Sequence, residues 1–112
     1  MDHKENKRRF QRIPLHLPIQ YKKRGETQFF NAICDNISSG GMGFVSPAFI
    51  PPESLVMLEI TILSRALKPI GRVARASTIP HTEKNYLGIE FLELDPQEKS
   101  YLKEYMEMQT GN

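Results

Sequence analysis

Tryptophan is absent from this chain of 112 residues, and cysteine occurs once. The single cysteine, Cys34, excludes an internal disulfide and any cysteine-rich metal site. The chain also lacks the roughly 20 consecutive apolar residues that a membrane helix needs. Residues 1–12 have no apolar segment of the secretion-signal type. The length of 112 residues fits one domain. The absences predict a protein of the cytoplasm that does not insert into a membrane.

Side chains suited to catalysis are scarce as well. None of the three histidines is spaced to share a metal ion with another; they are His3, His16 and His81. Cys34 has no sequence neighbour that would activate its thiol. Ser38 lies in a glycine-rich segment without the pattern of a hydrolase nucleophile, and no phosphate-loop or dinucleotide glycine motif occurs. The sequence therefore predicts no enzyme, no metal site and no cofactor.

Positive charge is concentrated at the start of the chain, although the net charge is only +2. Residues 1–24 hold eight positive and two negative side chains, a net +6, whereas residues 25–112 hold seven and eleven, a net −4. We call residues 1–12 the basic arm. A local patch of this kind suits a phosphate-bearing partner, and a solvated basic tail is the alternative interpretation.

Alternating apolar residues predict strands over most of the remaining chain. The expected strands cover residues 15–23, 27–34, 42–45, 55–63, 66–79 and 86–94. Within the fourth, the residues expected to face the core are Val56, Leu58, Ile60 and Ile62. Gly71 marks a bend or bulge, and residues 36–41 form a polar turn. Six strands without a βαβ rhythm predict an antiparallel β-barrel over residues 13–94.

The last segment has the pattern of a helix, residues 95–110. Asp95 is a suitable cap, Pro96 fits the first helical position and Glu98 completes a capping box. Apolar residues then recur at helical spacing, and we expect this stripe to cover the barrel. A contact between two copies of the chain, giving a homodimer, is the alternative.

Two short motifs carry most of the functional information. Arg8 and Arg12 are spaced as R-x-x-x-R in the basic arm, and guanidinium groups pair with phosphate oxygens and with the guanine edge. Asn36, Ser38 and Gly41 are spaced as N-x-S-x-x-G. On extended backbone Asn36 and Ser38 point to the same side. Each motif alone is weak, because basic pentapeptides and polar turns are common.

Taken together and in this order, the motifs resemble those of the PilZ domain family. Arg8 and Arg12 match the family's R-x-x-x-R, and the Asn36 motif matches its (D/N)-x-S-x-x-G. Residues 86–91, which read Tyr-Leu-Gly-Ile-Glu-Phe, are similar to the family's last strand. The resemblance spans about residues 7–94. It implies a six-stranded antiparallel β-barrel with a C-terminal helix, in a bacterial cytoplasm.

The resemblance also implies a ligand, the bacterial second messenger cyclic di-GMP (c-di-GMP). It implies that Arg8 and Arg12 grip guanine edges and phosphates, with Arg9 as an auxiliary contact. By the same resemblance Asn36 and Ser38 bond to a guanine base. The remaining ligand-binding candidates are Gly41, which would keep the turn shape, and Arg75, which would stack on a guanine. The alternative for Arg75 is an exposed strand arginine without a ligand contact.

Two positions bear on how this ligand would be held. Asn36 stands where the family more often has Asp, and an amide offers one acceptor oxygen where a carboxylate offers two. Lys7 directly precedes the arginine motif. In members of the family, a bulky apolar residue at this position goes with a single bound ligand. The resemblance therefore favours an intercalated pair of c-di-GMP molecules for each domain.

The predicted function is a c-di-GMP receptor or adaptor that changes conformation or partner binding when it captures the ligand. One alternative is a ligand-independent PilZ-like adaptor that binds a protein in pilus assembly or motility. A second alternative is a nucleic-acid-binding β-barrel. The sequence disfavours that class, because it has no Trp and no Tyr or Phe interleaved on a basic strand.

Overall fold

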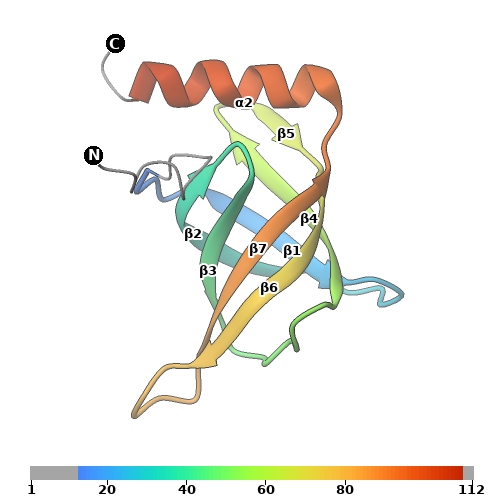
Figure 1. Ribbon diagram of the computed structural model, residues 1–112, viewed down its shortest axis with the longest axis vertical. Helices are drawn as coiled ribbons and strands as arrows, with labels where there is room; N and C mark the ends of the chain where they lie inside the picture. The colour runs from blue at the N-terminus through green and yellow to red at the C-terminus, as the bar shows by residue number, and fades with distance from the viewer. Residues whose placement is uncertain (1–12, 110–112) are drawn as a thin grey trace, which may run out of the picture.

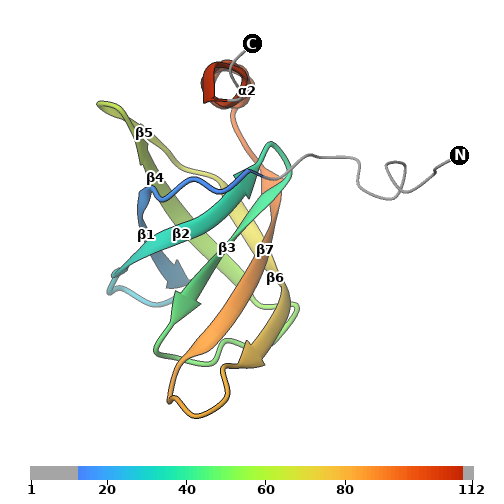
Figure 2. The ribbon, with the colours of Figure 1, turned by 90° about the vertical axis from the view of Figure 1, so that its left-hand side faces the viewer.

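The computed structural model describes residues 13–109, which form a closed β-barrel with a helix across one end (Figures 1 and 2). The barrel strands are β1 (Pro18–Lys23), β2 (Phe30–Ser38), β3 (Gly41–Ser46), β4 (Leu55–Ile62), β6 (Ile70–Thr78) and β7 (Asn85–Glu93). Their order is β1-β2-β3-β7-β6-β4, all neighbours are antiparallel, and a β1–β4 pairing closes the ring. An extra short strand, β5 (Arg65–Leu67), pairs with β4 alone among the described strands.

Alternation places one face of every strand inside the barrel. In β4 the inner residues are Val56, Leu58, Ile60 and Ile62, as the sequence predicts, and all four are buried. Tyr21 of β1 packs its ring 4.7 Å from that of Phe44 on β3. Its hydroxyl lies 2.7 Å from the Oγ atom of Ser46, so the buried phenol is hydrogen-bonded. Closure pairs both edges of the barrel strands, and this satisfies backbone groups that an open sheet would expose.

Several of the expected strand boundaries are wrong. The first two strands begin three residues later than expected, at Pro18 and Phe30. Residues 66–79 are divided between β5 and β6, because the chain turns at residues 68–69. Residues 36–41 are not one turn: β2 continues through Ser38, and β3 begins at Gly41. The bulge expected near Gly71 is confirmed by a register shift between Ile70 and Gly71 in the β6–β7 pairing.

The C-terminal helix, α2 (Pro96–Gln109), lies across the end of the barrel that holds the β2–β3 turn (Figure 1). Asp95 caps it by accepting the Gln97 N–H through Oδ1 at 2.8 Å. Glu98 instead accepts the Lys68 N–H at 3.1 Å, which ties the first turn to the β5–β6 connection. Leu102 is fully buried, and Tyr105 and Met106 pack against the core. The apolar stripe therefore covers the barrel, as expected.

Among residues 13–109 no helix has the length and apolar character required to cross a bilayer. The same residues contain no group of three or more side chains that could hold a metal ion.

Cys34 provides a test of the packing. Its side chain is fully buried, its Sγ donates to the Leu15 carbonyl at 3.0 Å, and burial raises the pKa of the thiol. The thiolate is the reactive form. We therefore expect the folded protein at pH 8 to react with a water-soluble disulfide reagent at least about tenfold more slowly than the urea-unfolded chain. Absorbance of the released thiolate measures both rates, and equal rates would contradict this packing.

Candidate functional site

Two β-bulges turn predicted ligand residues to the outside of the barrel. In β2, Cys34 pairs with Phe44 but Asn36 pairs with Gly43, so one residue is added between them. Cys34 faces the core, and strict alternation would send Asn36 inward as well. The added residue, Asp35, reverses that parity. Bulges commonly re-aim a side chain in this way, often next to functional sites.

The second bulge acts in the same way on β6. Val73 pairs with Ile89 in the core, whereas Arg75 pairs with Gly88, so Ala74 is the added residue. Arg75 is thereby directed outward, and its side chain is exposed. Without this bulge the guanidinium would point into an apolar interior, at a large desolvation cost.

Asn36 and Arg75 consequently lie in one row across four strands. Asn36 on β2 pairs with Gly43 on β3, Gly43 pairs with Gly88 on β7, and Gly88 pairs with Arg75 on β6. The two middle positions have no side chain, so an amide and a guanidinium flank a bare stretch of backbone. We call this row the glycine floor. A methyl group at Gly88 would meet three Arg75 atoms at 3.7–4.0 Å, so the arginine lies close along this floor.

Tyr86 of β7 covers the other half of the glycine floor. A Cβ atom at Gly43 would lie 1.8 Å from the Tyr86 hydroxyl oxygen, so only glycine leaves room for the ring. The same hydroxyl accepts a hydrogen bond from Asn36 Nδ2 at 3.0 Å. Because Nδ2 is turned toward Tyr86, the amide's carbonyl oxygen lies on the other branch of the planar group. The Tyr86 hydroxyl thus holds the Asn36 amide in place, and a phenol can pair with either the nitrogen or the oxygen of an amide.

Ser38 holds the turn that joins β2 to β3. Its Oγ atom accepts the Gly40 N–H at 3.0 Å and the Gly41 N–H at 3.1 Å, and it lies 3.4 Å from the Gly41 carbonyl oxygen. The side chain is only 2% exposed. The turn uses no left-handed glycine, since the described glycine with a positive φ is Gly25. In this geometry the Ser38 hydroxyl is occupied within the turn.

Substitution of Ser38 by alanine tests this role. It would leave two backbone N–H groups in a largely buried turn without their acceptor, at about 1–3 kcal/mol of unfolding free energy. We expect urea unfolding to show a loss of this size. Ser38→Thr keeps the acceptor oxygen and is the matched control. A Ser38→Ala protein with unchanged stability would show that the hydroxyl does not hold the turn.

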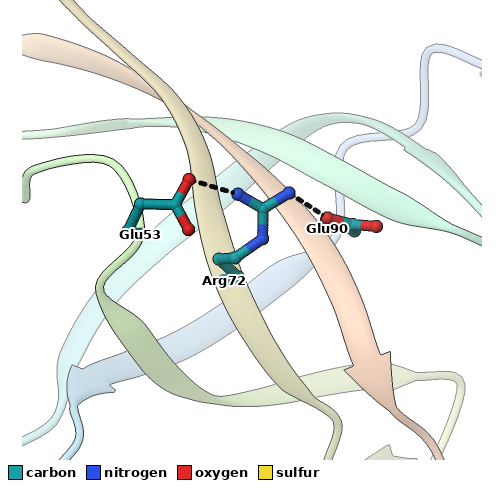
Figure 3. Close-up of polar contacts among 3 residues, drawn as sticks. All are labelled: Glu53, Arg72 and Glu90. Atoms are coloured by element: carbon teal, nitrogen blue, oxygen red, sulfur yellow. Dashed lines mark hydrogen bonds and ion pairs between the residues drawn. The ribbon is translucent and has the colours of Figure 1, made fainter.

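An ion-pair cluster borders the glycine floor (Figure 3). The Arg72 guanidinium on β6 donates to Glu90 on β7 and, at 2.8 Å, to Glu53 in the β3–β4 connection. The hydrogen bond to Glu90 raises the pKa of Arg72. Glu90 also pairs with Gly41, so the cluster lies in the row next to the floor. These contacts tie the connection before β4 to the strands that carry the site.

The basic arm joins the barrel beside Asn36. Ile13 and Ile37 exchange two backbone hydrogen bonds, of 3.0 and 3.1 Å, and Ile37 lies between Asn36 and Ser38 on β2. The chain therefore reaches the β2 edge at the Asn36 motif. The predicted ligand residues Arg8, Arg9 and Arg12 lie outside the described residues.

The structure brings together Asn36 and Arg75 in one row, and Ser38 and Gly41 in the turn next to it. Sequence reasoning missed Gly43, Gly88 and Tyr86 as parts of the site. One signal was present: Gly41 and Gly43 are two apart, and Gly88 follows Tyr86 by two, so each pair shares a strand face. Glycine at such positions indicates close approach of another group.

Comparison with known families identifies this arrangement. The sequence pattern of the family described as "PilZ domain" matches residues 6–108. The chain belongs to the PilZ domain family. Membership also supports the expectation that the chain is not an enzyme, because PilZ domains are non-catalytic receptor modules. A comparison with curated proteins gives no match.

Solved structures agree with this PilZ fold. The chain is similar to the Bacillus subtilis inhibitor of motility (MotI/DgrA), with a TM-score of 0.79, 20% identity, and coverage of 92% of this chain and 51% of that one. It therefore spans about half the length of MotI/DgrA. The PilZ domain of YcgR from Escherichia coli, solved with c-di-GMP, matches with a TM-score of 0.64 and 18% identity, and the match covers 86% of each chain. The Borreliella burgdorferi PlzA protein, solved in complex with c-di-GMP, matches with a TM-score of 0.56 and 13% identity, and the match covers 96% of this chain and 55% of that one.

Proposed function

We propose that this PilZ domain is a bacterial, cytoplasmic receptor for c-di-GMP. The observation that carries the proposal is the glycine floor, where two independent bulges turn Asn36 and Arg75 to the same outer row. A bulge costs ladder hydrogen bonds, and here each one exposes a side chain with guanine- or phosphate-binding chemistry. The two central glycines let the Tyr86 ring and the Arg75 side chain lie close over the backbone, and a flat guanine ring can stack on these groups.

The chemistry of the floor suits a guanine. The Watson–Crick edge of guanine presents N–H donors, and the Asn36 amide, which contacts the Tyr86 hydroxyl, offers a carbonyl oxygen as an acceptor. The Arg75 guanidinium is planar, and it can stack on a purine or pair with phosphate oxygens. Ser38 and Gly41 contribute through the turn they hold, which sets the position of Asn36. In this proposal Ser38 is therefore a positioning residue.

The basic arm supplies the remaining contacts. Ile13 is fixed beside Asn36, and Arg8 is five residues away, a span of at most about 18 Å of extended chain. Arg8, Arg9 and Arg12 are thus within reach of any ligand on the floor. Guanidinium forks bond to phosphates and to the O6 and N7 edge of guanine. Ordering the arm over the ligand costs conformational entropy, which these charge-assisted bonds offset.

Capture of the ligand would change the surface that the barrel presents. An arm held over the floor covers β2 and β3, and this alters which partner protein the domain binds. The domain would then act as an adaptor whose output depends on c-di-GMP. A partner controlled in this way is the expected downstream element.

Titration with c-di-GMP tests the proposal. Calorimetry gives the affinity and the stoichiometry, for which Lys7 favours two ligand molecules per domain. Amide resonances of Asn36, Gly43, Gly88 and Arg75 are expected to shift together. Cyclic di-AMP is the control ligand, because it keeps both phosphates but lacks the guanine O6 and N2 groups. Absence of binding at millimolar c-di-GMP would reject the receptor function and favour the ligand-independent adaptor.

A further inference from the structure

A second, apolar surface lies on the outside of the barrel, near the tip of the β1–β2 hairpin. One row crosses four strands there: Lys22 on β1 pairs with Met57 on β4, Met57 with Ile70 on β6, and Ile70 with Glu93 on β7. A hollow of about 470 Å³ is formed over this row, with Arg24 and Leu92 also on its wall. We call it the hairpin groove. Figure 1 shows the hairpin tip beside the start of β4.

The groove is longer than one hollow. A second hollow of about 430 Å³ shares Ile70, Leu92 and Glu93 with the first and continues to Lys68 and Asp95. The two together make an elongated depression across the ends of β6 and β7. This shape suits a length of polypeptide better than a compact small molecule.

The floor of the groove is apolar although it faces outward. Val56 and Leu58 point into the core of the barrel. Their neighbours along β4, Leu55 and Met57, therefore point outward. Leu92 is 47% exposed, because the register shift at Gly71 leaves it as the added residue of a bulge. Apolar residues on the outer face contribute nothing to the barrel core. Leu55, Met57 and Ile70 are partly exposed beside Leu92. A partly exposed apolar cluster with a polar rim is typical of a binding surface.

The charged side chains on the rim of the hairpin groove differ in sign between its two ends. Lys22 and Arg24 lie at the hairpin end, and within residues 13–109 neither is in an ion pair. Lys22 instead lies 5.0 Å from the centre of the Phe29 ring, which holds it near the groove. Glu93 and Asp95 lie toward the other end, beside Lys68. A partner is therefore attracted if it is acidic at the hairpin end only.

We propose that the hairpin groove binds a segment of a partner protein that carries apolar side chains and a cluster of Asp or Glu at one end. The apolar side chains enter the two hollows, and the carboxylates lie over Lys22 and Arg24. A membrane surface fits less well, because the apolar residues lie at the bottom of a hollow and a flat bilayer surface would not reach them. Nucleic acid fits less well too, because Glu93 and Asp95 repel phosphates.

The hairpin groove is separate from the glycine floor. Both lie on β6 and β7, but Arg72 lies between Ile70 and Arg75 along β6. Its ion pairs with Glu90 and Glu53 (Figure 3) separate the two surfaces. Variants of one site therefore leave the other site's side chains in place. The peptide surface is proposed independently of c-di-GMP binding, so either proposal can fail without the other.

A random library of twelve-residue peptides, selected on the whole chain, tests this inference. We expect enriched peptides to combine apolar residues with Asp or Glu at one end, and to shift the amide resonances of Met57, Ile70 and Leu92. Leu92→Asp is expected to weaken binding of the best peptide at least about tenfold. The charge-reversed pair Lys22→Glu and Arg24→Glu should weaken it by a similar factor, and the loss should shrink when peptide carboxylates are replaced by Lys. Asn36→Ala is the matched control and should bind the peptide like the wild type.

Several results would overturn the proposal. These are an absence of enrichment, enriched peptides without an excess of carboxylates, or equal peptide affinity in the wild type and the Leu92→Asp variant. Two further results would assign the surface to another occupant: sedimentation with phosphatidylglycerol vesicles that Leu92→Asp abolishes, or self-association that the same change abolishes. Thermal unfolding checks that Leu92→Asp folds, and the charge-reversed pair gives a second test if it does not.

Discussion

Alanine in place of Arg8 or Arg12 is expected to lower the affinity for c-di-GMP by about tenfold to a hundredfold in each case, as measured by calorimetry. Hydrogen bonds to charged groups contribute about 1.5–3 kcal/mol each, and a tenfold change in affinity corresponds to about 1.4 kcal/mol. Both arginines belong to the arm that joins the barrel at Ile13, beside Asn36. The double variant should bind too weakly to measure by calorimetry at micromolar protein.

The control for this prediction is a charge removed from the same arm. Lys4→Ala takes away one positive charge but no member of the arginine motif, so it should change the affinity by less than about threefold in 150 mM salt. Arg12→Lys keeps the charge and loses the planar fork, and it should fall close to Arg12→Ala. Thermal unfolding should be unchanged throughout, because the core cluster of the described residues begins at Ile13. Equal losses of affinity for Lys4→Ala and Arg8→Ala would show that the arm attracts the ligand only through its net positive charge.

Much of the fold follows from patterns that the sequence displays openly. The alternation from Val56 to Ile62 specifies an inner face because a strand has a period of two. Asp95 and Pro96 specify a helix start through capping chemistry, and the Gln97 N–H bond to Asp95 confirms it. The closed order of strands is less evident, since pairings such as β1 with β4 join residues far apart in the chain.

The site is harder to predict than the barrel, for a specific reason. A bulge adds one residue to one strand, and no residue type marks it: Asp35 and Ala74 are both uncommon in strands, but neither type signals a bulge. The parity of every residue after the bulge then depends on a partner strand that the local sequence does not name. Asn36 and Arg75 were recognisable as candidates from their chemistry and from family resemblance. Their placement in one row required the pairings of β2, β3, β7 and β6.

The Tyr86 contact changes how the Asn36 position is understood. An amide in place of a carboxylate loses one acceptor, which by itself weakens recognition of a guanine edge. In this chain the amide nitrogen has a partner of its own, the Tyr86 hydroxyl at 3.0 Å. The amide is thereby restrained beside Tyr86, so less rotamer freedom is lost when a ligand binds. Asn36 and Tyr86 act as one unit in the proposed site.

Alanine at Gly43 is expected to disrupt this unit without unfolding the barrel. The new Cβ would lie 1.8 Å from the Tyr86 hydroxyl oxygen and 2.6 Å from the ring carbon that bears it. These atoms are at the far end of a half-exposed side chain, so the ring can swing away while the backbone pairing of β3 and β7 stays. The swing breaks the bond to Asn36, removes the ring from its place over Gly43 and adds a methyl group to the glycine floor. We expect c-di-GMP affinity to fall at least about tenfold, roughly 1.4 kcal/mol or more.

Two variants separate the causes of this loss. Tyr86→Phe keeps the ring over Gly43 and removes only the hydrogen-bond acceptor of Asn36, so a loss of about 0.5–1.5 kcal/mol in binding is expected. Gly88→Ala adds the same methyl group where its nearest neighbours are at ordinary contact distance, 3.7–4.0 Å, and moves no aromatic ring. If Gly43→Ala displaces Tyr86 in amide and aromatic spectra but binds c-di-GMP like the wild type, the ligand does not lie on the glycine floor. A loss for Gly43→Ala that exceeds the loss for both other variants would instead place a guanine in contact with the Tyr86 ring over Gly43, because only that variant both releases Asn36 and moves the ring.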